Sequence, residues 1–90
     1  MTDPYRVELA AGVAKQLRKI DAVARTRIVK AIGLLATNPR PTTVKALVGH
    51  PGYLRVRVGD WRIVYTIRDE QLLVLVLTIG HRRDVYDQLP

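Results

Sequence analysis

Two alternating segments, Tyr53–Val58 and Trp61–Arg68, constrain this chain more than any other feature of its sequence. Both are rich in valine, isoleucine and aromatic residues, as strands are, and only a Gly-Asp pair separates them. A two-residue Gly-X loop is the signal of a type II′ turn, which joins antiparallel strands. In this register Arg57 lies directly opposite Arg62. We therefore expect a β-hairpin that brings two arginines side by side.

The opposed arginines are hard to explain by structure alone. Alternation puts Leu54 and Val56 on one face and Arg55 and Arg57 on the other, where Arg62 joins them. Like charges directly opposite each other destabilise a sheet by about 0.2–1 kcal/mol. Two explanations are open: a solvated face that protects an edge strand from aggregation, or a face that binds phosphate. The second arginine favours phosphate binding, because edge protection does not require it.

Two helices are predicted between a short first strand, Tyr5–Leu9, and the hairpin. Apolar residues recur with helical spacing at Val13, Leu17 and Ile20. Asp21 interrupts this run and is suited to cap the second helix. The apolar stripe of the second helix consists of Ala24, Ile28, Ile32 and Leu35. An Asn-Pro pair then ends that helix. Because about one residue joins the two helices, we expect an antiparallel helical hairpin.

The remaining segments complete an α+β domain. Thr42–Pro51 is expected to connect the helices to the hairpin, with Leu47 packed into the core. A turn at Asp69-Glu70 leads to a last strand, Leu72–Ile79, which is apolar throughout, as a central strand covered on both faces would be. We predict one domain spanning all 90 residues, in the order β-α-α-β-β-β. The helical hairpin packs on one face of a mainly antiparallel twisted sheet, and the arginines lie on the other face.

The amino-acid composition indicates which classes of binding partner the chain favours. Lysine and arginine number 15 against 8 acidic residues, a net charge of +7, which fits a nucleic acid or an acidic protein. Eleven of the 15 are arginine, the better fork for phosphate, although a genome-wide excess of arginine gives the same composition. Without cysteine, disulfides and thiolate metal sites are excluded, and a cytoplasmic location is expected. The polar start of the sequence predicts no signal peptide. The longest apolar run, Leu72–Leu77, is too short to span a membrane.

A second basic cluster follows the last strand. His81, Arg82 and Arg83 come directly after it, and Tyr86 lies one helical turn beyond Arg82. His81 is a candidate acid or base because histidine titrates near neutrality. A basic C-terminal cap with Tyr86 packed on the core explains the same residues without catalysis. No metal-ligand cluster, glycine-rich phosphate loop or nucleophile motif accompanies them, so we expect no metal and no cofactor.

Three other features carry weaker signals. His50 lies in a Gly-His-Pro-Gly turn and is predicted to be a loop residue rather than a catalyst. Trp61 is expected to pack against the core, and stacking on a base is the alternative. Charged residues of the helices, such as Arg18 and Lys19, are expected to form a solvated face, and attraction for an RNA backbone is the alternative.

Several motifs, taken together, resemble the RelE branch of the RelE/ParE toxin superfamily over nearly all of the chain. The matching pieces are Lys45–Gly49, Tyr53–Arg57, Trp61–Tyr65, Asp69-Glu70 and Gly80–Tyr86. The sequences WRIVY and GHRRDVY, in this order and spacing, carry most of the resemblance. It implies that the first strand lies beside the last one, which agrees with a central last strand.

The resemblance also implies a function. Such toxins enter the ribosomal A site and cut mRNA there through attack by the 2′-OH. A RelB-like antitoxin holds them silent, and the complex reaches promoter DNA only through the antitoxin. Two alternatives are a ParE-like inhibitor of DNA gyrase, and a degenerate toxin that acts only in the repressor complex.

The resemblance assigns the site residues by position. The implied catalytic set is Arg55, Arg57, Arg62, His81, Arg82 and Tyr86. Weaker RNA contacts are expected at Lys45, Trp61 and Arg83. The best-known family pattern has lysine where this chain has Arg55 and Arg57. Because arginine stays protonated in proteins, those two residues hold phosphate rather than accept a proton. His81 is then the candidate acid or base.

Overall fold

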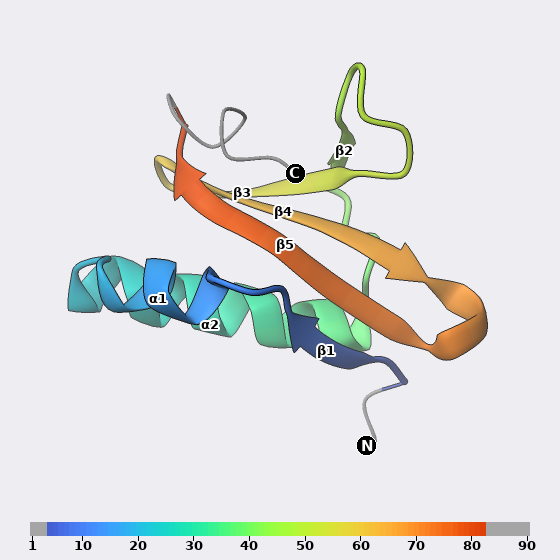
Figure 1. The fold of residues 1–90 in the computed structure, drawn as a ribbon, viewed down its shortest axis with the longest axis horizontal. Helices are drawn as coiled ribbons and strands as arrows, with labels where there is room; N and C mark the ends of the chain where they lie inside the picture. The colour runs from blue at the N-terminus through green and yellow to red at the C-terminus, as the bar shows by residue number, and fades with distance from the viewer. Residues whose placement is uncertain (1–3, 83–90) are drawn as a thin grey trace.

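Residues 4–82 are described by the computed structural model, in which two helices pack on one face of a five-stranded sheet (Figure 1). The elements are β1 (Arg6–Leu9), α1 (Val13–Arg18), α2 (Ala22–Thr37), β2 (Lys45–Ala46), β3 (Leu54–Val58), β4 (Trp61–Arg68), a 3₁₀ turn (Asp69–Gln71) and β5 (Leu73–His81). The α+β class is confirmed. The predicted order lacked only β2, a two-residue strand too short to have a sequence signature.

The sheet has the strand order β1-β5-β4-β3-β2. β1 pairs with β5 in parallel, and all other neighbours are antiparallel. β5 is therefore an interior strand with a paired neighbour on each side, as its apolar sequence predicted. The hairpin register is also confirmed, with Arg57 opposite Arg62 and Val56 opposite Ile63. Gly59 has φ 59°, the positive value that a tight hairpin turn of this kind requires.

The helices begin and end for identifiable local reasons. The Asp21 side chain accepts a hydrogen bond from the Ala24 N–H at 3.1 Å and caps α2, as predicted. The connection between the helices was predicted wrongly, because it has three residues, Lys19–Asp21, rather than about one. The N–H of Ile20 donates to the Leu17 carbonyl at 3.2 Å, a short-range bond that tightens the chain after Arg18. The chain therefore turns sharply between the two helices.

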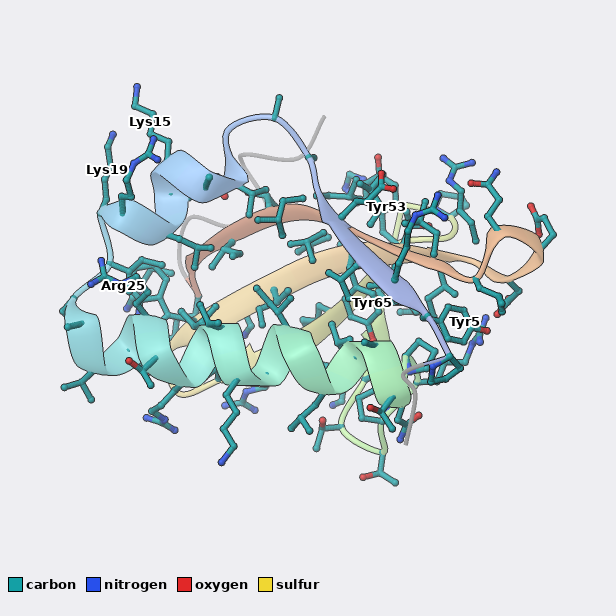
Figure 2. All side chains as sticks on the ribbon, turned by 90° about the horizontal axis from the view of Figure 1, so that it is seen from below. Tyr5, Lys15, Lys19, Arg25, Tyr53 and Tyr65 are labelled. Atoms are coloured by element: carbon teal, nitrogen blue, oxygen red, sulfur yellow. The ribbon has the colours of Figure 1, made fainter. Side chains whose placement is uncertain are left out.

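The core lies between α2 and the sheet. Ile28 of α2 and Ile63 of β4 are both fully buried. Tyr65 is also fully buried, and its hydroxyl donates to the Pro39 carbonyl at 2.7 Å; Figure 2 shows its ring between α2 and the sheet. Burial raises the pKa of Tyr65 to about 12. This bond ties the segment after α2 to the centre of the sheet.

Leu47 was predicted to pack into the core, and this prediction is wrong. Val44 packs against the core instead, while Leu47 lies beyond β2 and lines a surface hollow. The reason is β2 itself, since Lys45 and Ala46 pair with β3 and carry the chain across to the other side. From the sequence alone, a single apolar residue in a loop does not show on which side of the sheet a preceding two-residue strand will place it.

Gln16 of α1 extends the edge of β5 where β1 ends. Leu9 of β1 is opposite Val76. Beyond this point the Gln16 side chain accepts from the Ile79 N–H and donates to the Thr78 hydroxyl, both at 2.9 Å. The glutamine thus occupies the Ile79 N–H, a backbone donor that a neighbouring strand would otherwise bind.

Tyr5, Arg40 and Asp69 form a cluster that joins three distant segments. The Tyr5 hydroxyl donates to Asp69 Oδ1 at 2.6 Å, and Arg40 donates to both Asp69 oxygens at 3.1 and 2.8 Å. The hydrogen bonds from Arg40, followed by that from Tyr5, lower the pKa of Asp69 to about 2. The cluster therefore links the start of β1, the loop after α2 and the turn before β5.

This cluster predicts a loss of stability in acid. Because the folded pKa of Asp69 is below its ordinary 3.8, the contribution is complete above about pH 4 and is lost as the pH falls towards 2. We expect Asp69→Asn to lower the melting temperature at pH 6 and to match the native chain near pH 2. Thermal melting followed by circular dichroism across this range tests it. Equal differences at both pH values would contradict the assignment.

Candidate phosphate-binding face

Four cations form two like-charged pairs on the face of the sheet that points away from the helices. Lys45 of β2 is directly opposite Arg55 of β3, and Arg57 of β3 is directly opposite Arg62 of β4. Residues directly opposite in antiparallel strands share a face. We call these four residues the basic face. The structure thus brings together Arg55, Arg57 and Arg62, as predicted, and adds Lys45 in an equivalent position.

Among residues 4–82, no carboxylate forms an ion pair with the exposed cations of the basic face. The ion pairs found within residues 4–82 lie elsewhere and are Arg6–Glu8, Arg40–Asp69 and Arg82–Asp60. Repulsion within each like-charged pair costs stability, on the order of 0.2–1 kcal/mol. A bound polyanion would remove that cost. The arrangement therefore fits a phosphate-binding face better than an edge-protecting one.

Arg62 is the fixed member of the basic face. Its side chain is buried, with a relative exposure of 8%. Nη1 donates to the carbonyl of Gly59 at 3.2 Å and to that of Trp61 at 3.1 Å. The hairpin turn therefore holds this guanidinium in one place, whereas the side chain of Arg57 across the hairpin is exposed. The basic face thus combines a guanidinium held by the hairpin turn with one that is exposed to solvent.

Arg82 lies at the hairpin end of the basic face. Its N–H donates to the Asp60 carbonyl at 2.8 Å, and its guanidinium is 3.9 Å from the Asp60 carboxylate. It therefore adds a partly neutralised positive charge at the turn. The other predicted tail residues, Arg83 and Tyr86, lie outside the described part of the chain.

His81 and Trp61 lie on the opposite face from the arginines. Their rings meet edge to face, with centroids 5.8 Å apart and planes at 83°. They are directly opposite each other in the sheet, whereas the residue opposite Arg62 is Gly80. Both residues line a hollow of about 230 Å³ that Lys19, directly after α1, also borders. The structure therefore does not bring His81 together with the predicted arginines. Trp61 packs on the core, as expected.

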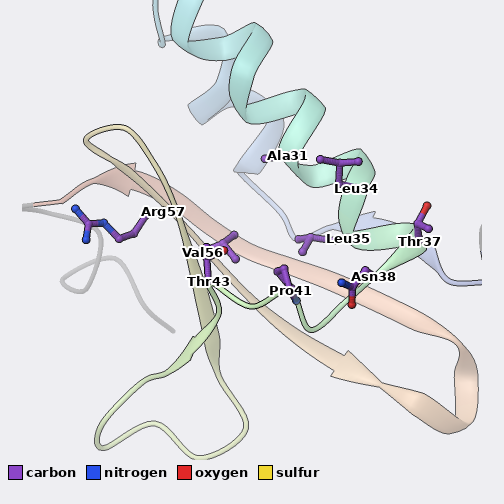
Figure 3. A pocket seen from close by; sticks show the side chains of 9 residues that line it. All are labelled: Ala31, Leu34, Leu35, Thr37, Asn38, Pro41, Thr43, Val56 and Arg57. Carbon is purple, nitrogen blue, oxygen red and sulfur yellow. The ribbon is translucent and has the colours of Figure 1, made fainter.

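His50 was predicted to be a loop residue, and it lies in the loop between β2 and β3. It lines a hollow of about 420 Å³ together with Arg55 and Leu47. The loop that carries it, between β2 and β3, stands on the side of the sheet away from the helices (Figures 1 and 3). Its ring stacks on Tyr53, with centroids 5.7 Å apart and planes at 18°. The Gly-His-Pro-Gly turn signals a loop, but only the pairing of β2 determines which face that loop covers.

A separate apolar groove lies on the helix side of β3. Its volume is about 320 Å³, and its lining includes Leu34 and Leu35 of α2 and Val56 of β3 (Figure 3). Leu34 is 61% exposed, unusual for a leucine beside the core. In Figure 3 the Arg57 side chain extends away from these apolar residues. The groove thus offers an apolar surface with a positive charge at its rim.

Charged side chains of the helical layer point into solvent. Figure 2 shows Lys15 and Lys19 pointing into solvent at one end of the helical layer, the solvated arrangement that was predicted. Among residues 4–82 no group of three or more His, Asp or Glu side chains could hold a metal ion. Within the same residues, neither helix is long and apolar enough to cross a membrane.

Comparison with known families identifies the class of protein that this fold and basic face define. The family model for the ParE toxin of type II toxin–antitoxin systems, parDE, matches residues 7–86. The chain belongs to this family of toxins. It is 30% identical to toxin RelG of Mycobacterium tuberculosis, a match covering 92% of this chain and 97% of that one. It is 27% identical to the mRNA interferase toxin RelE of Escherichia coli K12, covering 93% and 92% respectively.

Solved structures give the same result. The toxin–antitoxin complex RelBE2 of Mycobacterium tuberculosis contains a chain that is 30% identical to this one, with a TM-score of 0.76. The match covers 88% of this chain and 99% of that chain. Within the RelE/ParE superfamily the protein is therefore a toxin of the RelE type, with the RelE-like fold that its motifs predicted.

Proposed function

We propose that this toxin is an mRNA endonuclease that acts in the ribosomal A site. The observation that carries the proposal is the basic face, on which two like-charged pairs lie side by side and whose exposed cations have no carboxylate partner within the described part of the chain. A face of this kind binds a phosphate backbone. Support also comes from the name of a relative, the mRNA interferase toxin RelE. The substrate in this proposal is the mRNA strand exposed in the A site.

The proposed reaction needs no metal. The 2′-OH of the substrate attacks the adjacent phosphorus, and the bond to the 5′-oxygen breaks. Arg57 and Arg62 hold the phosphate and stabilise the charge that develops on its oxygens. Arg55 and Lys45 bind the neighbouring backbone. The products are a 2′,3′-cyclic phosphate and a 5′-hydroxyl.

Induced expression followed by mapping of mRNA 5′ ends tests this proposal. We expect breaks in phase with codons, with 5′-hydroxyl ends. Ends that carry 5′-phosphate would contradict the 2′-OH mechanism. The family description names ParE toxins, so a ParE-like inhibitor of DNA gyrase is the second candidate. A DNA-damage response with intact mRNA would support gyrase inhibition. Antitoxin binding without any growth effect would support a degenerate toxin.

We also propose a RelB-like antitoxin as the partner that silences the toxin. The related chain from Mycobacterium tuberculosis was solved in a toxin–antitoxin complex. In this chain the apolar groove between α2 and β3 fits an apolar segment of such a partner. β2 covers only Leu54 and Arg55 of β3, so the rest of that strand's outer edge can pair with an added strand. The net charge of +7 favours an acidic partner.

Leu34→Glu tests the groove as the antitoxin contact. We expect at least a tenfold weaker affinity, because a carboxylate replaces an apolar contact on the groove wall and loses about 1.4 kcal/mol or more. Folding should persist, since Leu34 is 61% exposed. Val23→Glu, at a 74% exposed position of the same helix, is the matched control and should bind normally. Isothermal titration with the antitoxin encoded beside the toxin measures both. Equal affinities would exclude the groove.

A further inference from the structure

We propose that His50 is the catalytic base that takes the proton from the 2′-OH. This inference rests on the proposed nuclease function and extends it to a residue outside the set that the resemblance implied. The chain has two histidines and no cysteine. Histidine is the side chain whose ordinary titration lies between pH 5 and 8. The first candidates for a base near neutral pH are therefore His50 and His81.

The two histidines differ in the face they occupy. His81 is directly opposite Trp61, on the helix side of the sheet. His50 shares its hollow with Arg55, on the side of the arginines. Arg55 and Arg57 are two residues apart on β3 and so point to the same face, roughly 7 Å apart along the strand. A phosphate held by Arg57 and Arg62 can thus lie with the ribose that carries the attacking 2′-OH on the Arg55 side, towards His50.

Hydrogen bonds within the loop fix the backbone of His50. The backbone carbonyl of His50 accepts from the Tyr53 N–H at 3.0 Å, and the Leu47 N–H donates to the Tyr53 carbonyl at the same distance. Gly49 and Gly52 flank the histidine with φ 80° and 83°, values that only glycine adopts freely. The ring itself stacks on Tyr53. Positioned side chains are what proton transfer requires, since the geometry must be set before the reaction.

Among residues 4–82, the other groups on this side are poorly suited to accept the proton. Arg55 lines the hollow and Lys45 is directly opposite it on β2; both are cationic side chains, while Tyr53 is a phenol. Asp60, at the far end of the hairpin, is held by Arg82. The hollow of about 420 Å³ leaves room beside the imidazole for part of a nucleotide. His50 therefore combines a suitable group, a fixed position and space for the substrate.

In the proposed step one P–O bond forms while another breaks, and His50 takes one proton. A ring nitrogen of neutral His50 takes the proton from the 2′-OH while the 2′-oxygen forms its bond to phosphorus. The bond between phosphorus and the 5′-oxygen breaks, and the electron pair leaves with that oxygen. The 5′-oxygen takes a proton from water. The imidazolium then returns its proton to solvent, which restores the enzyme.

The experiment measures cleavage of ribosome-bound mRNA by the purified full chain between pH 5 and 9. We expect His50→Gln to reduce the cleavage rate at pH 7.5 about 100-fold or more, the scale of general base catalysis. The native rate should rise with pH through the histidine range, and the variant rate should not. Lys30→Ala, an exposed substitution on α2, controls for handling and should cleave normally.

Chemical rescue separates catalysis from structure. Added imidazole should restore part of the activity of His50→Ala in proportion to its concentration, with an unchanged melting temperature. A native rate for His50→Gln would overturn the inference, and so would a loss in His50→Ala that imidazole does not restore. A loss confined to His81→Gln would also overturn it. If the native chain leaves mRNA intact on the ribosome, the proposed function itself fails, which is a different result.

Discussion

Arg57→Ala is expected to reduce mRNA cleavage about 100- to 1000-fold, the cost of removing one preorganised donor to a developing oxyanion. The side chain is exposed and forms no ion pair among the described residues. Folding should therefore persist. Stability should even rise by a few tenths of a kcal/mol, because the repulsion with Arg62 disappears. Quantitative cleavage on programmed ribosomes and thermal melting measure the two effects.

The matched control for Arg57→Ala is Arg68→Ala. Arg68 is an exposed strand arginine that lies outside the basic face. The change in net charge is the same, so a general loss of attraction for RNA would affect both variants equally. Equal activity of the two variants would remove the basic face as the site of cleavage.

Arg62→Ala is expected to abolish cleavage and also to destabilise the fold. This arginine is buried and donates to two carbonyls of the hairpin turn. Hydrogen bonds from charged groups contribute about 1.5–3 kcal/mol. We therefore expect the free energy of unfolding to fall by about 2 kcal/mol, which lowers the melting temperature of a domain this size by roughly 8–16 °C.

The contrast between the two arginines is itself informative. Arg62→Ala should lose both activity and stability, whereas Arg57→Ala should lose activity alone. Denaturant unfolding and cleavage assays on the same preparations test this pattern. A stable Arg62→Ala would mean that the turn does not depend on the buried guanidinium. Full cleavage by that variant would mean that the phosphate is held elsewhere.

Local signals predicted most of the fold correctly. The Gly-Asp turn and the alternation around it determined the register that puts Arg57 opposite Arg62, and the cap at Asp21 marked the start of α2. Both depend on residues close together in sequence. Placement of β1 beside β5 came from the family resemblance. Parallel pairing leaves no local signature, because Val7 and Val74 meet only when the chain has folded.

The candidate site was only partly predictable, and the reason is geometric. The arginines were found because alternation along one hairpin sets their face. His81 was grouped with them because it follows the strand closely, but its register opposite Trp61 puts it on the other face. His50 was predicted only as a loop residue, and its place beside Arg55 was not foreseen, because the two-residue β2 that precedes its loop has no sequence pattern of its own. Loop orientation depends on long-range pairing, which sequence spacing does not encode.

The pairing of β1 with β5 has a consequence for the time at which this toxin becomes active. Arg6 is opposite Leu73, so β1 can pair only after β5, which is synthesised later, has become available. β5 also supplies the neighbour of β4 and the strand that α1 contacts. A nascent chain therefore cannot close its core until β5 has left the ribosome that makes it. Folding of this toxin is thus coupled to translation of β5, because the five-stranded sheet cannot form without its second strand.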